Sequence, residues 1–150
     1  MLRKLFIIIG LLFCFAFVAK ATHQRAAEIT YTWSGGSAYE FTLTTYNVPN
    51  AAWEQRDSLF MDWGDGTSEY IPRIYWTNMG DDCIKNIYRQ THTYSTSGTY
   101  VVSMEDANRN YGVINVPNSV MVPMHIETEL IINPFFGLQQ LGAATQRACG

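Results

Sequence analysis

The chain has 150 residues, of which 14% are aromatic and only 15% charged, and its formal net charge is −3. This length accommodates one domain with a hydrophobic core plus a short additional segment. The low charge content and the lack of an apolar repeat at helical spacing argue against a helical protein.

Residues 1–21 have the pattern of a secretory signal peptide. Arg3 and Lys4 precede an apolar run, Leu5 to Val18, and Ala19-Lys20-Ala21 has the small-x-small form of a cleavage site. The alternative is an N-terminal membrane anchor, but the run is shorter than the roughly 20 residues that span a bilayer. We therefore expect an exported protein, secreted or held at the cell surface.

Removal of this segment makes the chain more acidic. The basic residues fall from 10 to 7 while the acidic residues remain 13, which gives a formal charge of −6. No basic patch remains to neutralise a phosphate backbone, so we expect no nucleic-acid partner.

The rest of the chain alternates apolar and polar residues in short segments separated by turn signals. This alternation predicts strands at residues 28–33, 39–46, 58–63, 67–71, 83–94, 99–105 and 124–132. One further strand is expected between the turn at 108–112 and the last strand. Loops are expected at 47–56 and at 72–82, the longest irregular stretch. The residues expected to face inward are Ile29, Tyr31, Trp33, Tyr39, Phe41, Leu43, Leu59, Met61, Trp63, Tyr100, Val102, Met104, Met124, Ile126, Leu130 and Ile132.

Period-two alternation gives each strand one buried and one solvated face, which is typical of antiparallel sheets. Seven or so such strands predict an all-β fold of two sheets packed face to face, an immunoglobulin-like β-sandwich. Another small all-β barrel is the alternative.

The most informative segment is Trp63-Gly64-Asp65-Gly66-Thr67. It predicts a tight hairpin, because glycine adopts positive φ without steric cost and Asp65 can accept hydrogen bonds from turn N–H groups. A second turn, Thr96-Ser97-Gly98, leads into the strand that begins at Thr99. We expect His92 to make a hydrogen bond that fixes its strand. Tyr94 is expected to act as a tyrosine corner, with its hydroxyl bonded to nearby backbone.

The segment from Trp63 to Thr67 resembles part of the PKD domain, an extracellular immunoglobulin-like β-sandwich. The resemblance extends to His92-Thr93-Tyr94 and Gly98-Thr99-Tyr100-Val101. Further stretches resemble the N-terminal region of exported, gliding-motility-associated bacterial surface proteins. They are residues 21–26, 29–31, 104–110, 112–120 and 126–130.

The resemblance implies a non-catalytic module of a large surface protein, sorted by a type IX-like secretion route and adjoining other domains of the same chain. Residues 22–132 form the expected PKD-like domain. Because the alternation ends after Phe135, residues 133–150 are expected to be a linker or the truncated start of another module. The implied structural motif comprises Trp63, Gly64, Asp65, Gly66, Thr67, His92, Tyr94, Gly98 and Tyr100.

Neither a metal nor a cofactor is expected. The carboxylate pairs Asp62/Asp65, Asp81/Asp82 and Glu105/Asp106 lack the spacing of a calcium loop, and apart from Asp65 we expect them on solvated loops. His23, His92 and His125 have no partner at zinc-ligand spacing. Cys83 and Cys149 could form one bridge, but we treat them as unpaired.

Catalytic residues are not expected either. Ser58, His92 and Asp62 contain the residue types of a hydrolase triad, but no nucleophile elbow or glycine-rich oxyanion segment accompanies them. An exported hydrolase fragment is therefore the weakest of three functional hypotheses.

Trp53, Tyr75 and Trp76 fall in predicted loops. Tyr75 and Trp76 could stack on sugar rings, or the three residues could cover the ends of the sandwich. The alternative function is therefore a carbohydrate-binding accessory module. The partner would then be a surface polysaccharide, and another cell-surface protein is a further candidate. Exposed strand edges could also pair with a neighbouring domain.

Overall fold

The computed structural model describes residues 24–48, 56–81, 83–106, 109, 112–114 and 116–133, and the backbone of 147–148. The signal sequence, Trp53, Asp82, Cys149 and most of residues 133–150 lie outside this part of the chain. Among the described residues, no helix is long and apolar enough to span a membrane.

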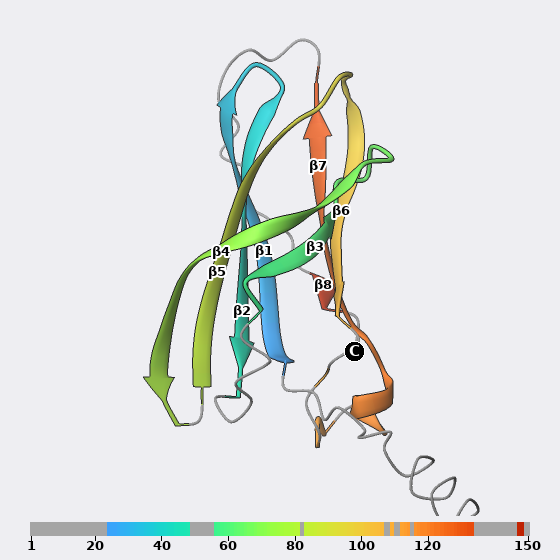
Figure 1. Cartoon of the computed structure of the whole chain (residues 1–150). Coiled ribbons are helices and arrows are strands. Elements are labelled where there is room, and N and C mark those ends of the chain that lie inside the picture. The colour runs from blue at the N-terminus through green and yellow to red at the C-terminus, as the bar shows by residue number, and fades with distance from the viewer. Residues whose placement is uncertain are drawn as a thin grey trace, which may run out of the picture.

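The described protein is all-β and antiparallel, with one turn of 3-10 helix at Ser119–Met121. The strands are β1 (Gln24–Gly35), β2 (Ala38–Asn47), β3 (Ser58–Asp62), β4 (Ser68–Gly80), β5 (Cys83–Thr93), β6 (Gly98–Asp106), β7 (Met124–Ile132) and the two-residue β8 (Arg147–Ala148). They follow the order β1-β2-β5-β4-β3-β6-β7-β8 (Figure 1).

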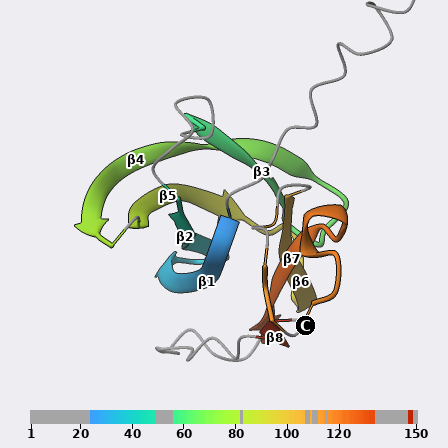
Figure 2. The same cartoon turned by 90° about the horizontal axis from the view of Figure 1, so that it is seen from below.

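Strand β4 belongs to both halves of this arrangement. Its first part, Ser68–Pro72, pairs with β3, and its second part, from Arg73 to Gly80, pairs with β5. The sheet consequently bends strongly around the core (Figure 2). The bend brings β1 close to β7, where the Tyr31 hydroxyl donates a hydrogen bond of 3.2 Å to the carbonyl of Glu129.

The core is built from the inward faces of all seven long strands. The alternation predicted from the sequence is confirmed for β2, β3, β6 and β7, whose inward residues are buried or partly buried. The largest fully buried side chains include Trp63, Tyr88, Tyr94 and Phe41. Trp33, expected inside, is 43% exposed; it lies beside the turn between β1 and β2, where its Nε1 donates to Gly36 O at 2.9 Å.

Two predictions from the sequence are wrong: one loop and one strand. Residues 72–80 continue β4 instead of forming a loop, because Arg73–Gly80 finds a new partner in β5. Pro72 and the loss of clean alternation concealed this strand. In the described residues between Gly112 and Met124 the extra strand is absent, and the short 3-10 helix stands there instead.

Two buried threonines provide a test of this core. The hydroxyl of Thr128 on β7 is buried without a hydrogen-bond partner among the described residues, whereas the hydroxyl of Thr45 donates to Asn47 Oδ1 at 3.1 Å. Because an unpaired buried hydroxyl costs about 1–3 kcal/mol, we expect Thr128→Val to raise the free energy of unfolding by about 1 kcal/mol. The matched change Thr45→Val should lower it. Urea denaturation measures both, and a similar loss in both variants would contradict this description of Thr128.

Candidate functional site

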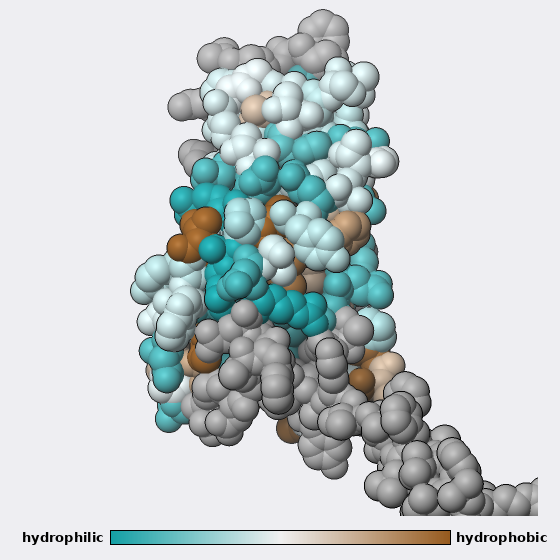
Figure 3. Space-filling model, in the orientation of Figure 1, coloured by the Kyte–Doolittle hydropathy of each residue, from teal (hydrophilic) through white to brown (hydrophobic). Residues whose placement is uncertain are grey.

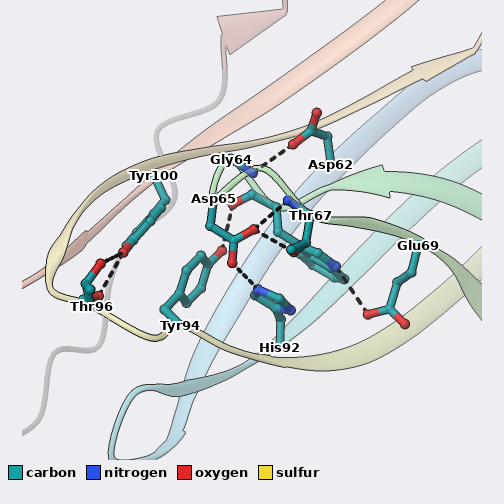
Figure 4. Close-up of polar contacts among 10 residues, drawn as sticks. Asp62, Gly64, Asp65, Thr67, Glu69, His92, Tyr94, Thr96 and Tyr100 are labelled. Carbon is teal, nitrogen blue, oxygen red and sulfur yellow. Dashed lines mark hydrogen bonds and ion pairs between the residues drawn. The ribbon is translucent and has the colours of Figure 1, made fainter.

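The glycine-aspartate motif forms the connection between β3 and β4. Trp63 N donates to Thr67 O at 3.1 Å and closes the turn, while Asp62 Oδ1 accepts from Gly64 N at 2.8 Å. Asp65 Oδ1 accepts from the Thr67 backbone N–H at 2.9 Å and from the Thr67 hydroxyl (Figure 4). The expected role of Asp65 as an acceptor of turn N–H groups is thus confirmed.

The second oxygen of Asp65 joins this turn to the end of β5. Asp65 Oδ2 lies 2.8 Å from His92 Nε2, and both side chains are mostly buried. Burial raises the pKa of the Asp65 carboxyl, but the hydrogen bonds from Thr67 and His92 outweigh it, so the pKa is lowered from its ordinary value. The carboxylate therefore stays ionised, as its acceptor role requires.

Two aromatic rings, those of Trp63 and Tyr94, pack beside this pair. The His92 ring stacks on Trp63, with a centroid separation of 4.7 Å and an interplanar angle of 7°. Tyr94 meets the His92 ring edge to face at 4.7 Å and donates its hydroxyl proton to Trp63 O at 3.1 Å. Burial raises the pKa of Tyr94, which keeps this hydroxyl a donor. His92 therefore has the fixing role predicted for it.

We expected the hydroxyl of Tyr94 to bond to nearby backbone, as in a tyrosine corner. It is instead Tyr100 whose hydroxyl bonds to backbone only a few residues upstream. The Tyr100 hydroxyl donates to Thr96 O at 2.8 Å, four residues upstream, and also contacts Thr96 Oγ1 at 2.8 Å. Tyr94 instead bonds the backbone of Trp63, 31 residues earlier. Both tyrosines flank the connection from β5 to β6, and the sequence offered no means of distinguishing them.

Trp63 is held at both its ring and its backbone. Its side chain is 1% exposed and packs on Phe41, with ring centroids 5.1 Å apart. Its Nε1 donates to Glu69 Oε1 at 3.2 Å, and Glu69 Oε2 accepts from Gln90 Nε2 at 3.5 Å. The indole N–H is therefore satisfied, as a buried tryptophan requires.

Gly64 is the position at which the turn touches β6. Its φ is +75°, and a Cβ built there would lie 2.5 Å from Val101 O and 2.8 Å from Val101 N. Both contacts are with backbone, which cannot move aside as a flexible side chain would. Only glycine fits between this turn and the backbone of β6.

Ser58, His92 and Asp62 are not joined to one another by hydrogen bonds in the described structure. His92 is bonded to Asp65, and no hydrogen bond joins it to Ser58 or Asp62 in the described part of the chain. Among the same residues there is no group of three or more His, Cys, Asp or Glu that could hold a metal ion.

Tyr75 and Trp76 lie on β4, not in a loop. They are 53% and 50% exposed. Tyr75 pairs with Ile87 of β5 and Trp76 with the fully buried Asn86, so the two rings project to opposite faces of the sheet. They do not form one flat platform for a sugar ring.

The sequence missed a second polar cluster, at the far end of β6. Asp106 was expected on a solvated loop, but its side chain is 1% exposed and lies 3.0 Å from Arg56 Nη2. Gln24 Nε2 also donates to it at 3.2 Å. Glu105, next to it, points outward and is exposed, as expected. The ion pair explains the burial, because a buried carboxylate needs a charged or hydrogen-bonded partner.

Comparison with protein-family models, with curated proteins and with solved structures found no significant match.

The contact between Gly64 and Val101 predicts a large effect of a small substitution. Gly64→Ala should lower the free energy of unfolding by at least about 2 kcal/mol, since alanine adds both a backbone clash and strain at positive φ. Gly98→Ala is the matched control, because its Cβ would meet only Tyr100 side-chain atoms at 3.7 Å or more. Thermal unfolding of the two variants should differ clearly, and equal stabilities would refute this reading of the turn.

The lowered pKa of Asp65 predicts a pH-dependent contribution to stability. A folded-state pKa below the unfolded value of about 3.9 means that the contribution is present above that pH and lost as the pH falls through the folded pKa. Asp65→Asn should lower the free energy of unfolding by about 1.5–3 kcal/mol at pH 7, and this gap between the variant and wild type should close in acid. Denaturant titrations from neutral to acidic pH measure this gap.

Asp81→Asn, in the exposed turn between β4 and β5, controls for the loss of one charge. It should have little effect at any pH. If the difference in unfolding free energy between Asp65→Asn and wild type stays constant in acid, the charge of this carboxylate does not contribute to stability.

Proposed function

We propose that the chain is a non-catalytic, PKD-like β-sandwich module of a large bacterial surface protein, with a structural or adhesive role in surface attachment or gliding. The single observation that carries this proposal is how the motif residues are used. Asp65, His92, Trp63 and Tyr94 bond to one another across the fold, so their polar groups serve to hold the structure.

The order of the strands supports an immunoglobulin-like arrangement. Constant-type immunoglobulin domains place strands A, B, E and D in one sheet and C, F and G in the other. In chain order these correspond to β1-β2-β5-β4 and β3-β6-β7, which is the order found here. The hydrogen bond from Tyr100 to Thr96 O lies where strand E passes to strand F, the place of the tyrosine corner in such domains.

An extracellular location is proposed from the signal-like sequence at residues 1–21. The acidic balance of the remaining chain favours solubility and gives no reason to expect a nucleic-acid ligand.

The carbohydrate-binding alternative has less support. Tyr75 and Trp76 are half exposed, as ligand-contacting aromatics would be, but they face opposite sides of β4. Binding to an insoluble polysaccharide that is lost when both residues are changed to alanine would favour this alternative.

The proposal is tested in the bacterium that encodes the chain. The gene is deleted and restored as wild type, with Gly64→Ala, with Gly98→Ala or without residues 2–21, and the protein is detected with an antibody on intact cells. Wild type and Gly98→Ala should be labelled at the surface and restore attachment or gliding. The form lacking residues 2–21 should stay inside, and Gly64→Ala should be depleted because its module is unstable.

Wild-type protein that remains inside the cell, or a deletion strain with normal attachment and gliding, would contradict the proposal.

A further inference from the structure

The second part of β4 has an edge that no described strand covers. From Ile74 to Gly80 this strand pairs with β5 on one side, and in the described part of the chain no strand pairs with its other side. Strand β3 follows β4 only as far as Pro72, with one more backbone bond from Arg73 N to Asp57 O at 2.7 Å. The hairpin of β4 and β5 therefore projects beyond the region that β3 covers (Figure 1).

This edge lacks two of the features that usually prevent strand-to-strand association, and its pairing with β5 is regular from Tyr75 to Asn78, between two irregularities. Exposed edges are commonly blocked by charged residues or proline, whereas residues 74–80 contain neither. Four large apolar side chains in this segment are at least half exposed: Ile74, Tyr75, Trp76 and Met79. The face seen in Figure 3 is mainly hydrophilic with separate hydrophobic patches, and one of these lies over β4. Such an edge is suited to pairing with another strand.

We propose that this edge pairs with the same edge of a second copy of the chain, in an antiparallel, two-fold symmetric dimer centred on Thr77. In this register Thr77 lies opposite Thr77 of the second copy, and Trp76 lies opposite Asn78, all within the regular part of the strand. Pairs of threonines are favourable across antiparallel strands.

The charges at the two ends of the segment favour a second copy as the occupant. Arg73 precedes the uncharged segment and Asp81 follows it, so antiparallel pairing about Thr77 places an arginine and an aspartate, and not two like charges, at each end of the interface. Arg73 keeps its bonds to Asp57 and Asn86, at 2.8 and 3.2 Å. The attraction to Asp81 is therefore a longer-range one.

The remaining surface disfavours other contacts between copies. Beyond residue 21 the chain has a formal charge of −6, so two copies repel one another on average. The outward positions of β6 and β7 include Glu105, Glu127 and Glu129. The uncharged stretch of β4 is a place where two copies can approach without this repulsion.

The experiment compares the chain lacking residues 1–21 with two variants by sedimentation velocity over a range of concentrations. Thr77→Glu places two carboxylates opposite each other at the two-fold axis, while within one copy it lies beside Lys85, its register partner on β5. The dimer dissociation constant should rise at least about tenfold, an effect within the range of like charges placed opposite each other in a sheet or interface. Thr99→Glu makes the same change at an exposed position of β6 and should leave the dimer unaffected.

A crosslink tests the register. With Cys83 and Cys149 changed to serine, Thr77→Cys should form a disulfide-linked dimer on mild oxidation, because directly opposed strand residues have Cα atoms about 4.5–5.5 Å apart. Cysteine at Thr99 should not crosslink. A chain that remains monomeric at all concentrations, or a dimer that withstands Thr77→Glu, would overturn the proposal, provided that circular dichroism shows both variants folded.

Discussion

The contact between Asp65 and His92 is the interaction on which the rest of the structure depends. It joins the turn between β3 and β4 to the end of β5, which lies in the other half of the sheet. The neighbouring contacts depend on it, because the His92 ring can stack on Trp63 only while it is held in this orientation. Tyr94 then closes the arrangement through its bond to Trp63 O. One carboxylate thus organises backbone, aromatic and hydrogen-bonded contacts between segments far apart in the sequence.

The features predictable from sequence are those set by local chemistry. Alternation identified the inward faces around Phe41, Met61 and Val102, and turn chemistry identified the role of Asp65. What the sequence could not supply was partner choice. The second part of β4 is a strand because β5 lies beside it, and Asp106 is buried because Arg56 reaches it. Arg56 is far from Asp106 in the sequence, so no local pattern encodes that pair. Strand β5 follows β4 directly, but Pro72 and the broken alternation concealed their hairpin.

The same distinction applies to the candidate site. Several motif residues contact one another, but the sequence did not indicate their individual partners, since Tyr94 and Tyr100 have similar sequence surroundings and different hydrogen bonds. Tyr75 and Trp76 are adjacent in sequence and half exposed, yet the pleat of β4 directs them to opposite faces. A fold that is held by internal contacts, and in which part of β4 has no second strand partner among the described residues, is suited to display and association, which agrees with the proposed surface role.

A double-mutant cycle on Asp65 and His92 tests the central claim most directly. The free energy of unfolding is measured at neutral pH for wild type, Asp65→Ala, His92→Ala and the double variant. If the two side chains act as one unit, their coupling energy is on the order of 1–2 kcal/mol, because the double variant loses less than the sum of the single losses. Losses that add to within about 0.5 kcal/mol would contradict the claim.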